Sequence, residues 1–310
     1  VVDEPSVVAL DRRTDKMIAV GNDAKMMYEK EHPNIHTIRP LRDGVIANFT
    51  ACEQMMRGLI KMVHSGNHLF SPSLRMVIGV PSGSTEVELR AVRDSAEHAG
   101  GRDVYLVFEP MAAALGMGLD VEAPEGNMIV DIGGGSTEIA VISLGGIVCN
   151  NSIRVAGDDL TADIQEYMSR QHNVRVSERM AERIKVHVGS ALTDLGDEAP
   201  EDYIVHGPNR RTALPMEFPV CYQEIAHCLD KTVAKIEICL NLMRPLVFDG
   251  EGFVGFIGVG SVVMVVVKAA FGQVCDVQQV FERVLRPQCL DGLALSFSVR
   301  FWLRAFNSFR

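Results

Sequence analysis

The chain has 310 residues, a formal net charge of −10 and a pI of about 5.4, with 47% hydrophobic and 23% charged residues. This composition is normal for a soluble globular protein, and the length suggests two domains or one large divided domain. The acidic balance and the lack of a large Lys/Arg cluster exclude a protein held to nucleic acid by phosphate contacts. The seven cysteines are scattered and never spaced Cys-x-x-Cys, which is typical of free thiols in a reducing cytosol rather than of a disulfide framework or zinc site.

The first half of the sequence predicts alternating strands and helices. The apolar run from Leu74 to Gly83 ends in a Pro/Gly turn and predicts a strand buried on both faces, and DVYLVFEP, residues 103–110, predicts a second buried strand. Between them, Thr85 and Glu88 form a Thr-x-x-Glu capping box for a helix that ends at Gly100-Gly101. A small-residue helix, PMAAALGMGL, follows the second strand.

The polar stretch VEAPEGN, residues 121–127, is the best candidate for a domain boundary. After it, MIVDI, TEIAVIS and IVCNNSIRVAG are joined by tight glycine turns and predict an antiparallel meander. Amphipathic helices are predicted over residues 157–172, 177–191 and 222–243, with a polar hairpin-like excursion over residues 196–215.

The uncharged run from Phe253 to Val267 has fifteen residues and is followed by Lys268. That is short of the roughly 20 residues needed to cross a bilayer. We therefore expect a buried strand, a tight turn and the start of a buried helix.

The sequence DIGGGST, from Asp131 to Thr137, carries the strongest chemical signal. Glycines between strands expose successive backbone N–H groups, and such a nest binds anions, most commonly phosphate. Asp131 is suited to hold Mg²⁺ or its waters, while Ser136 and Thr137 add hydroxyl donors. A dinucleotide-binding fingerprint is excluded because Glu138 stands at the third glycine, and a P-loop is excluded because Gly-Lys-Ser/Thr is absent. An ordinary glycine hairpin is the remaining alternative.

The stretch VDIGGGSTEIAVIS resembles the second phosphate motif of the actin/Hsp70/sugar-kinase superfamily. Longer stretches resemble the MreB family of bacterial actin-like cell-shape proteins across residues 1–240, among them VIGVPSGSTEVELRAV, VYLVFEPMAAALGMGL, IRVAGDDLTADI and ERMAERIKVHVGSA. The resemblance implies an α/β actin-like ATPase fold in which two ribonuclease-H-like domains, each with a smaller inserted subdomain, flank a nucleotide cleft. It implies a first domain over residues 1–118, with a small subdomain at about 1–35. The second domain would cover 119–310, with a small subdomain at about 158–220.

The resemblance also implies ATP with Mg²⁺ and assigns a role to individual residues. Glu109 would position the attacking water, and Asp131 would act on the Mg²⁺, through its waters. The residues expected to contact the nucleotide are Gly133, Gly134, Gly135, Ser136 and Thr137 at the β- and γ-phosphates; Gly157 and Asp158 near the ribose and phosphates; Glu182, Arg183 and Lys185 at the ribose and adenine; and Gly258, Gly260 and Ser261 on the adenine side.

Several of these residues have a simpler alternative. Glu109 would place a negative charge at a helix N-terminus, and Asp158 would be an N-cap. Glu182 and Lys185, which share one helix face at i, i+3 spacing, would form a solvated surface pair.

The chain departs from the family pattern at Asn48, which replaces an acidic residue, in the C-terminal region beyond residue 268, and at two of the nucleotide motifs. In FIGVGS, residues 256–261, Ile257 and Val259 replace the threonine and the central glycine of the family's adenine-side motif. The family's first phosphate motif, on an Asp-Leu/Ile-Gly-Thr hairpin, would precede DEPSVVAL. The sequence as given starts too late to contain this hairpin. We therefore expect a first domain that is open on the γ-phosphate side, with doubtful ATPase activity and poor polymers.

The function implied is that of an ATP-binding, filament-forming protein with slow ATP hydrolysis. It would organise cell-wall synthesis and rod shape, in the cytoplasm and peripheral to the inner membrane. Its partners would be copies of itself in double filaments, the inner membrane surface, and membrane proteins of cell shape and wall synthesis. Leu69 and Phe70, side by side in a polar loop, would form a membrane-binding foot, unless they fold back onto the core. A non-hydrolysing structural protein on the same fold is one alternative. Another superfamily ATPase such as a sugar kinase is a second, although no sugar-binding signature is visible.

Overall fold

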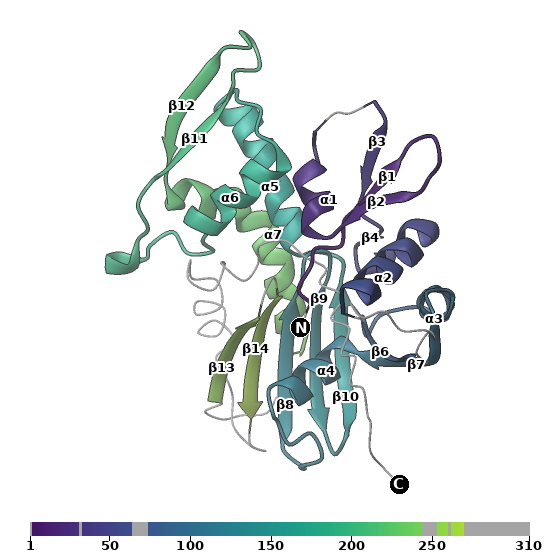
Figure 1. The fold of residues 1–310 in the computed structure, drawn as a ribbon. Coiled ribbons are helices and arrows are strands. Elements are labelled where there is room, and N and C mark those ends of the chain that lie inside the picture. The colour runs from purple at the N-terminus through teal and green to yellow at the C-terminus, as the bar shows by residue number, and fades with distance from the viewer. Residues whose placement is uncertain (1, 31–32, 64–73, 244–252, 260–261, 270–310) are drawn as a thin grey trace. The chain divides into compact units, whose positions relative to one another are not determined.

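The computed structural model describes residues 2–30, 33–63, 74–243, 253–259 and 262–269 (Figure 1). The chain divides into two compact units, the first reaching Ala112 and the second beginning at Ala113. Each unit has its own hydrophobic core.

The first unit begins with a small antiparallel sheet of order β2-β1-β3, against which the short helix α1 packs. Its strands are short segments rich in apolar residues, and in the central strand Val8 and Ala9 are completely buried. The elements are β1 (Val8–Asp11), β2 (Met17–Val20), α1 (Asn22–Met27), β3 (Ile35–Ile38), and the short pair β4 (Leu41–Arg42) and β5 (Val45–Ile46).

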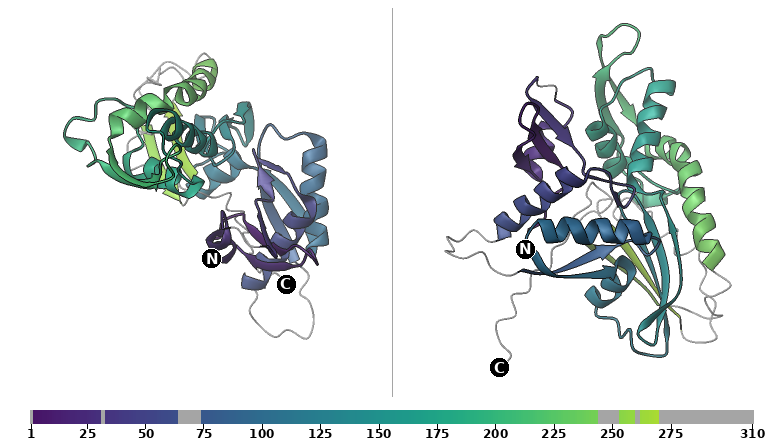
Figure 2. Two further views of the ribbon diagram at one scale, coloured as in Figure 1. Left: turned by 90° about the horizontal axis from the view of Figure 1, so that it is seen from above. Right: turned by 90° about the vertical axis from the view of Figure 1, so that its right-hand side faces the viewer.

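A parallel strand pair and two helices complete the first unit: α2 (Phe49–Val63), β6 (Leu74–Val80), α3 (Glu86–His98) and β7 (Gly101–Phe108). The predicted capping box is confirmed, since Thr85 Oγ1 accepts from Glu88 N at 3.3 Å and Glu88 Oε2 accepts from Thr85 N at 2.8 Å. Helix α3 lies against β7 and against α2, as Figure 2 also shows.

The prediction that β6 and β7 are buried on both faces is wrong for the described residues. In β6 buried and exposed side chains alternate, so that Met76 and Ile78 face the helices while Val77 is 43% exposed. On the open face Arg75 and Asp103 form an ion pair across the two strands. The apolar run arises because both faces carry aliphatic residues, not because both are covered.

The second unit is built on a five-stranded sheet of order β10-β9-β8-β14-β13, in which all neighbours are antiparallel. Its strands are β8 (Gly126–Ile132), β9 (Thr137–Ser143), β10 (Gly146–Ile153), β13 (Phe253–Val259) and β14 (Val262–Ala269). The predicted meander of β8, β9 and β10 is confirmed. The turn between β9 and β10 places Leu144 and Gly145 at positive φ, a conformation that glycine adopts without strain.

The predicted helix start in the run from Phe253 to Val267 is wrong, because its second half is strand β14, paired with both β8 and β13. The residues VVMVVV at positions 262–267 are almost all β-branched, which favours a strand once neighbouring strands are available. In the part of the chain that the structure describes, no helix is long and apolar enough to span a bilayer.

Helices α4 (Glu109–Gly116), α5 (Gly157–Gln171), α6 (Glu178–Val188) and α7 (Tyr222–Met243) follow the predicted pattern closely. α5 packs against both α6 and α7, and α7 lies on β9 and β10 (Figure 1). The excursion between α6 and α7 contains η1 (Gly196–Glu198) and the hairpin of β11 (Tyr203–Pro208) and β12 (Pro215–Val220), which packs on α6. The apolar faces of α5 and α6 meet β8 and β9 in one core that includes Ile139, Leu160, Ile164 and Ile184.

Candidate functional site

The predicted phosphate loop is a four-residue connection, Gly133 to Ser136, between β8 and β9. Gly133 N donates to Ser136 O at 2.9 Å, which closes the turn. A Cβ on Gly133 would lie 3.3 Å from that same Ser136 carbonyl oxygen, tighter than most real contacts. The tight closure therefore favours glycine at this position without any positive φ.

The loop is tied to the first turn of α5. Gly157 N donates to Gly133 O at 3.1 Å, and Asp158 N donates to Gly134 O at 2.7 Å. The carbonyl side of the loop is thus fixed to the positive end of a fifteen-residue helix. Among the described residues, no acceptor is recorded for the N–H groups of Gly134, Gly135 and Ser136. Successive N–H groups of this kind, when left unpaired, are the groups that bind an anion in a backbone nest.

Thr137 has a different environment from the one predicted for a phosphate donor. Its side chain is completely buried, and its Oγ1 donates to Val155 O at 2.7 Å. The hydroxyl therefore anchors the start of β9 to the strand-to-helix connection before α5.

Asp131 lies in β8 two residues before the loop, and the residue is 9% exposed. Its antiparallel partner in β9 is Glu138, which is 1% exposed and whose carboxylate accepts from Ser152 Oγ in β10. Directly paired residues project from the same face of a sheet, so two carboxylates lie on one face beside the loop. Sequence analysis missed Glu138 as a site residue, although its place opposite Asp131 follows from a four-residue loop. No cluster of three or more His, Cys, Asp or Glu suited to a metal occurs in the described part of the chain.

The alternative that Asp158 caps α5 is wrong, because the N-cap position lies two residues earlier. Gly157 is its first residue, Ala156 is the N-cap, and Asp159 Oδ2 accepts from Ala156 N at 3.0 Å. Asp158 is the second residue of the helix, and its N–H is directed at the loop.

The alternative that Glu182 and Lys185 form a solvated pair is also wrong. Their side chains are 5% and 1% exposed, and Lys185 Nζ lies 2.8 Å from Glu182 Oε2. Nζ also donates to Gly157 O and to Thr161 Oγ1, both at 2.9 Å. The other carboxylate oxygen, Glu182 Oε1, is buried and has no hydrogen-bond partner among the described residues. A buried acceptor without a donor is rare in a native protein and marks a place where a ligand or water donates.

The other predicted residues are spread more widely. Glu109 is the first residue of α4, in the first unit, where it follows β7 and is half-buried beside Gly79. Arg183 is exposed on α6, and its carbonyl oxygen accepts from His187 Nδ1 at 2.7 Å. Gly258 pairs with Val263 between β13 and β14. Gly260, Ser261, Leu69 and Phe70 lie outside the described residues.

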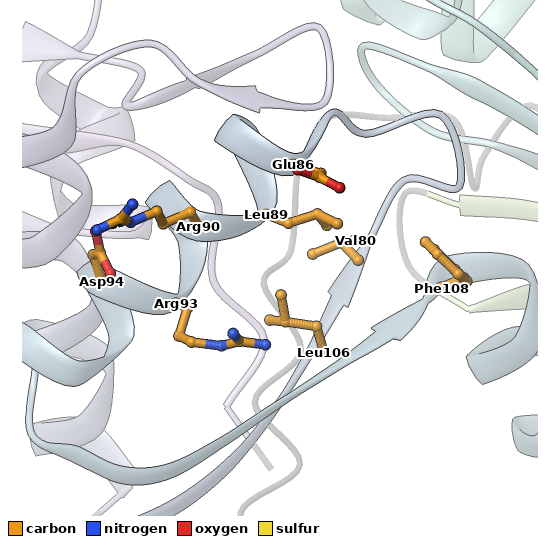
Figure 3. Close-up of a pocket in the computed structure, with 8 residues that line it drawn as sticks. All are labelled: Val80, Glu86, Leu89, Arg90, Arg93, Asp94, Leu106 and Phe108. Carbon is orange, nitrogen blue, oxygen red and sulfur yellow. Dashed lines mark ion pairs between the residues drawn. The ribbon is translucent and has the colours of Figure 1, made fainter.

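A separate pocket lies in the first unit, at the carboxyl ends of β6 and β7, with a volume of about 530 Å³. Figure 3 shows Val80, Leu89 and Leu106 gathered between α3 and the two strands, with Arg93 reaching toward Leu106 and Phe108 set apart from them. The lining residues are Val80, Glu86, Leu89, Arg90, Arg93, Asp94, Leu106 and Phe108. None of them is a predicted site residue.

Comparison with known proteins gives a consistent result. A family model described as MreB/Mbl protein matches residues 1–243. The cell shape-determining protein MreB of Haemophilus influenzae is 43% identical over 255 residues, which cover 79% of this chain and 72% of that protein. The Escherichia coli K12 protein of the same name is 46% identical over 242 residues, with coverage of 76% and 68%. The Mbl protein of Bacillus cereus is 42% identical over 236 residues, with coverage of 76% and 69%.

Solved structures are similar as well. The crystal structure of MreB 5 of Spiroplasma citri bound to AMPPNP has a TM-score of 0.69 and 33% sequence identity, covering 77% of this chain and 70% of that one. The double helical filament of MamK has a TM-score of 0.59 with 18% identity, covering 78% and 74%, a likeness that shows the fold alone. Both are actin-like proteins, and the predicted fold class is confirmed.

Proposed function

The chain belongs to the MreB/Mbl family of actin-like cell-shape determinants, and from that membership we propose that it binds ATP with Mg²⁺ at the glycine loop of the second unit. The observation that carries the proposal is the set of three N–H groups at Gly134, Gly135 and Ser136. These groups have no acceptor in the described structure and follow one another along a loop that is fixed to α5. Fixed, unpaired N–H groups bind phosphate without having to reorganise.

The carboxylates beside the loop fit Mg²⁺. This ion usually keeps several waters and takes only one or two protein carboxylates in addition to substrate phosphates. Asp131, 9% exposed at the end of β8, supplies one such carboxylate, and Glu138 opposite it adds negative charge on the same face. A dedicated protein cage of three or more ligands is not required, in agreement with the described residues.

Glu182, on α6, is suited to accept a hydrogen bond from a ribose hydroxyl. Glu182 Oε1 is an unpaired, buried acceptor, and a sugar hydroxyl is a donor of suitable chemistry. Lys185 Nζ binds both Glu182 and the carbonyl oxygen of Gly157, and Gly157 binds the glycine loop, so we propose that one nucleotide engages both Glu182 and the loop. Among nucleotides, ATP is favoured by the AMPPNP and ADP bound to the related structures of Spiroplasma citri MreB5.

We propose slow hydrolysis of the bound ATP, with Glu109 orienting the attacking water. A carboxylate that accepts a hydrogen bond from water holds it in line for attack and takes up its proton. Bound Mg-ATP supplies the phosphoanhydride bond and the cation charge that offsets the negative charge of the phosphates. The backbone N–H groups of the loop stabilise charge on the phosphate oxygens.

We also propose that the protein polymerises into double filaments that act in wall synthesis at the inner membrane surface. Its family membership supports self-assembly, and heterologous contacts between successive subunits produce open filaments. Leu69 and Phe70 are proposed as the membrane contact, with weak binding by one subunit and strong binding by a filament through avidity. Sedimentation of filaments with liposomes tests this. The double variant Leu69→Ser, Phe70→Ser should lose co-sedimentation while still forming filaments in electron micrographs, and retained co-sedimentation would exclude the contact.

Calorimetry tests the nucleotide proposal. The protein should bind Mg-ATP at a single site, and Asp131→Asn should weaken that binding by roughly tenfold or more, because a hydrogen bond to a charged group contributes about 1.5–3 kcal/mol. Asp197→Asn is the matched control, since it removes an exposed carboxylate from the same unit. Absence of binding to the folded protein would contradict the proposal, as would equal weakening by the two variants.

A further inference from the structure

The pocket at the carboxyl ends of β6 and β7 has an apolar interior. Val80 is 3% exposed, Leu89 and Leu106 are half-buried, and all three side chains line the pocket. Its volume of about 530 Å³ lies within the roughly 300–1,000 Å³ that is typical of ligand pockets. The size and the lining therefore suit a small molecule with an apolar body.

The charged residues of the pocket divide into one pair and two single groups. Arg90 Nε lies 3.8 Å from Asp94 Oδ2, one helical turn away on α3, so these two charges compensate each other. Arg93 and Glu86 line the same pocket, but neither forms a hydrogen bond or ion pair with any residue that the structure describes. A guanidinium group presents several N–H donors to a carboxylate at once, so Arg93 is an unused site for an anion.

Arg93 and Glu86 lie at opposite ends of the apolar interior. Their positions on α3 are two turns apart, which corresponds to about 10 Å along the helix at a rise of about 1.5 Å per residue. In Figure 3, Leu89, Val80 and Leu106 are drawn between them, and Arg93 reaches toward Leu106. A positive end, an apolar middle and a negative end favour a ligand that carries one negative charge at one end only.

We propose that this pocket binds a small amphipathic monocarboxylate, such as a fatty acid of medium chain length. The carboxylate pairs with Arg93, and the chain covers Leu106, Leu89 and Val80 and ends near Glu86. The pocket lies in the first unit and shares no residue with the glycine loop of the second unit, so binding here does not depend on the nucleotide proposed above.

Decanoate is the probe, and calorimetry on the whole chain without nucleotide measures its binding. Decanoate should bind at one site roughly threefold or more tighter than octanoate, because each further methylene group contributes up to roughly fourfold when it is fully buried. Decan-1-ol has the same chain length without the charge and should bind roughly threefold or more weaker than decanoate. Absence of saturable decanoate binding at millimolar concentration would overturn the proposal, as would equal binding of the alcohol.

The variant Arg93→Gln tests the anionic end. It should weaken decanoate binding roughly threefold or more and leave the binding of decan-1-ol unchanged, a modest factor because Arg93 is exposed and water screens its charge. Arg90→Gln is the matched control, since it removes the same charge from the same helix but from a guanidinium group that is paired with Asp94. Equal weakening by the two variants would indicate a general attraction of the anion to the surface and would overturn the role of Arg93.

Decanedioate, which carries a second carboxylate, tests the opposite end. The ratio of its dissociation constant to that of decanoate should fall roughly threefold or more in Glu86→Gln, because the repulsion between two like charges is removed. Glu97→Gln removes an exposed carboxylate from the same helix outside the pocket and should keep the parent ratio. A ratio that is unchanged in Glu86→Gln would overturn the placement of the chain end.

Amide NMR spectra of the whole chain locate the ligand. On saturation with decanoate, the amide resonances of Leu89, Arg93 and Leu106 should shift, whereas that of Ile164, completely buried in α5 of the second unit, should stay in place. Binding by calorimetry without a shift of the three pocket amides would place the fatty acid elsewhere and would overturn the proposal.

Discussion

Replacing Lys185 by methionine should destabilise the second unit by about 3–5 kcal/mol, the cost of leaving one charge of a buried pair without its partner. Methionine has a similar length and fills the same space, so little of this cost arises from packing. Glu182 has a side chain that is 5% exposed, and among the described residues only Thr161 Oγ1 would remain within hydrogen-bonding distance of its carboxylate. The free energy lost therefore reflects an unpaired charge that cannot reach water.

An exposed pair on α5 provides the comparison. Arg170 and Glu166 are in contact at i, i+4 spacing, but their side chains are 71% and 54% exposed. Exposed pairs of this kind contribute about 0.3–0.5 kcal/mol, because water screens them. Arg170→Met should therefore cost several kcal/mol less than Lys185→Met, although each substitution removes one cation from one ion pair.

Urea unfolding followed by far-UV circular dichroism, without nucleotide, measures both effects by linear extrapolation. The double variant Glu182→Gln, Lys185→Met should recover at least half of the loss, since burying a neutral amide costs much less than burying a carboxylate. The reasoning is refuted if Lys185→Met and Arg170→Met have the same effect. It is also refuted if the double variant is no more stable than Lys185→Met alone.

Three further results are expected. Thr85→Ala removes the cap of α3 and should lower the unfolding free energy by about 1 kcal/mol, whereas an unchanged urea midpoint would show that the cap contributes nothing. Burial raises the pKa of the Cys228 thiol from 9.0 to about 12, with the negative charge of Asp163 acting in the same direction. The folded state therefore holds this proton more tightly than the unfolded state. The thiol's contribution to the free energy of unfolding is constant below pH 9 and is lost as the pH rises toward 12. Between pH 8.5 and 11 the urea midpoint should accordingly fall less in Cys228→Ala than in the parent. An equal fall in the two proteins would contradict the raised pKa of Cys228. Glu109→Ala should hydrolyse ATP roughly 10²-fold more slowly while still binding it, and hydrolysis at the parent rate would rule out its assigned role.

Much of the second unit could be predicted from local sequence. The glycine turn in DIGGGST joins two apolar runs that are too short for helices, and the structure pairs them as β8 and β9. The helix over 222–243 was predicted with the same bounds that the structure shows, because a 3.6-residue apolar period over 22 residues has few alternatives.

The errors arose where tertiary contacts decide the outcome. Val262–Val267 is uniformly apolar, and periodicity cannot distinguish a strand from a buried helix in such a run. In β6 the exposure of Val77 depends on which face the helices cover, and this is not encoded in the strand itself.

The candidate site shows the same limit. The i, i+3 spacing of Glu182 and Lys185 is identical in an exposed pair and a buried one, so only the packing of α6 on α5 shows that the pair is enclosed. That packing also brings Thr161 to the pair, across twenty-one positions of sequence from Glu182. The motif located the loop and its acid, but the hydrogen bonds that hold them come from segments far apart in the chain.

The most direct test of the account is the amide NMR spectrum of the loop with and without Mg-AMPPNP. If the loop is the phosphate site, the amide resonances of Gly134, Gly135 and Ser136 should shift on saturation, because their N–H groups would gain an anionic acceptor. Gly145, whose N–H already donates to Val121 O at 2.7 Å in the turn between β9 and β10, is the internal control and should stay in place. Loop amides that do not move at saturating nucleotide, or that move no more than Gly145, would contradict the central claim.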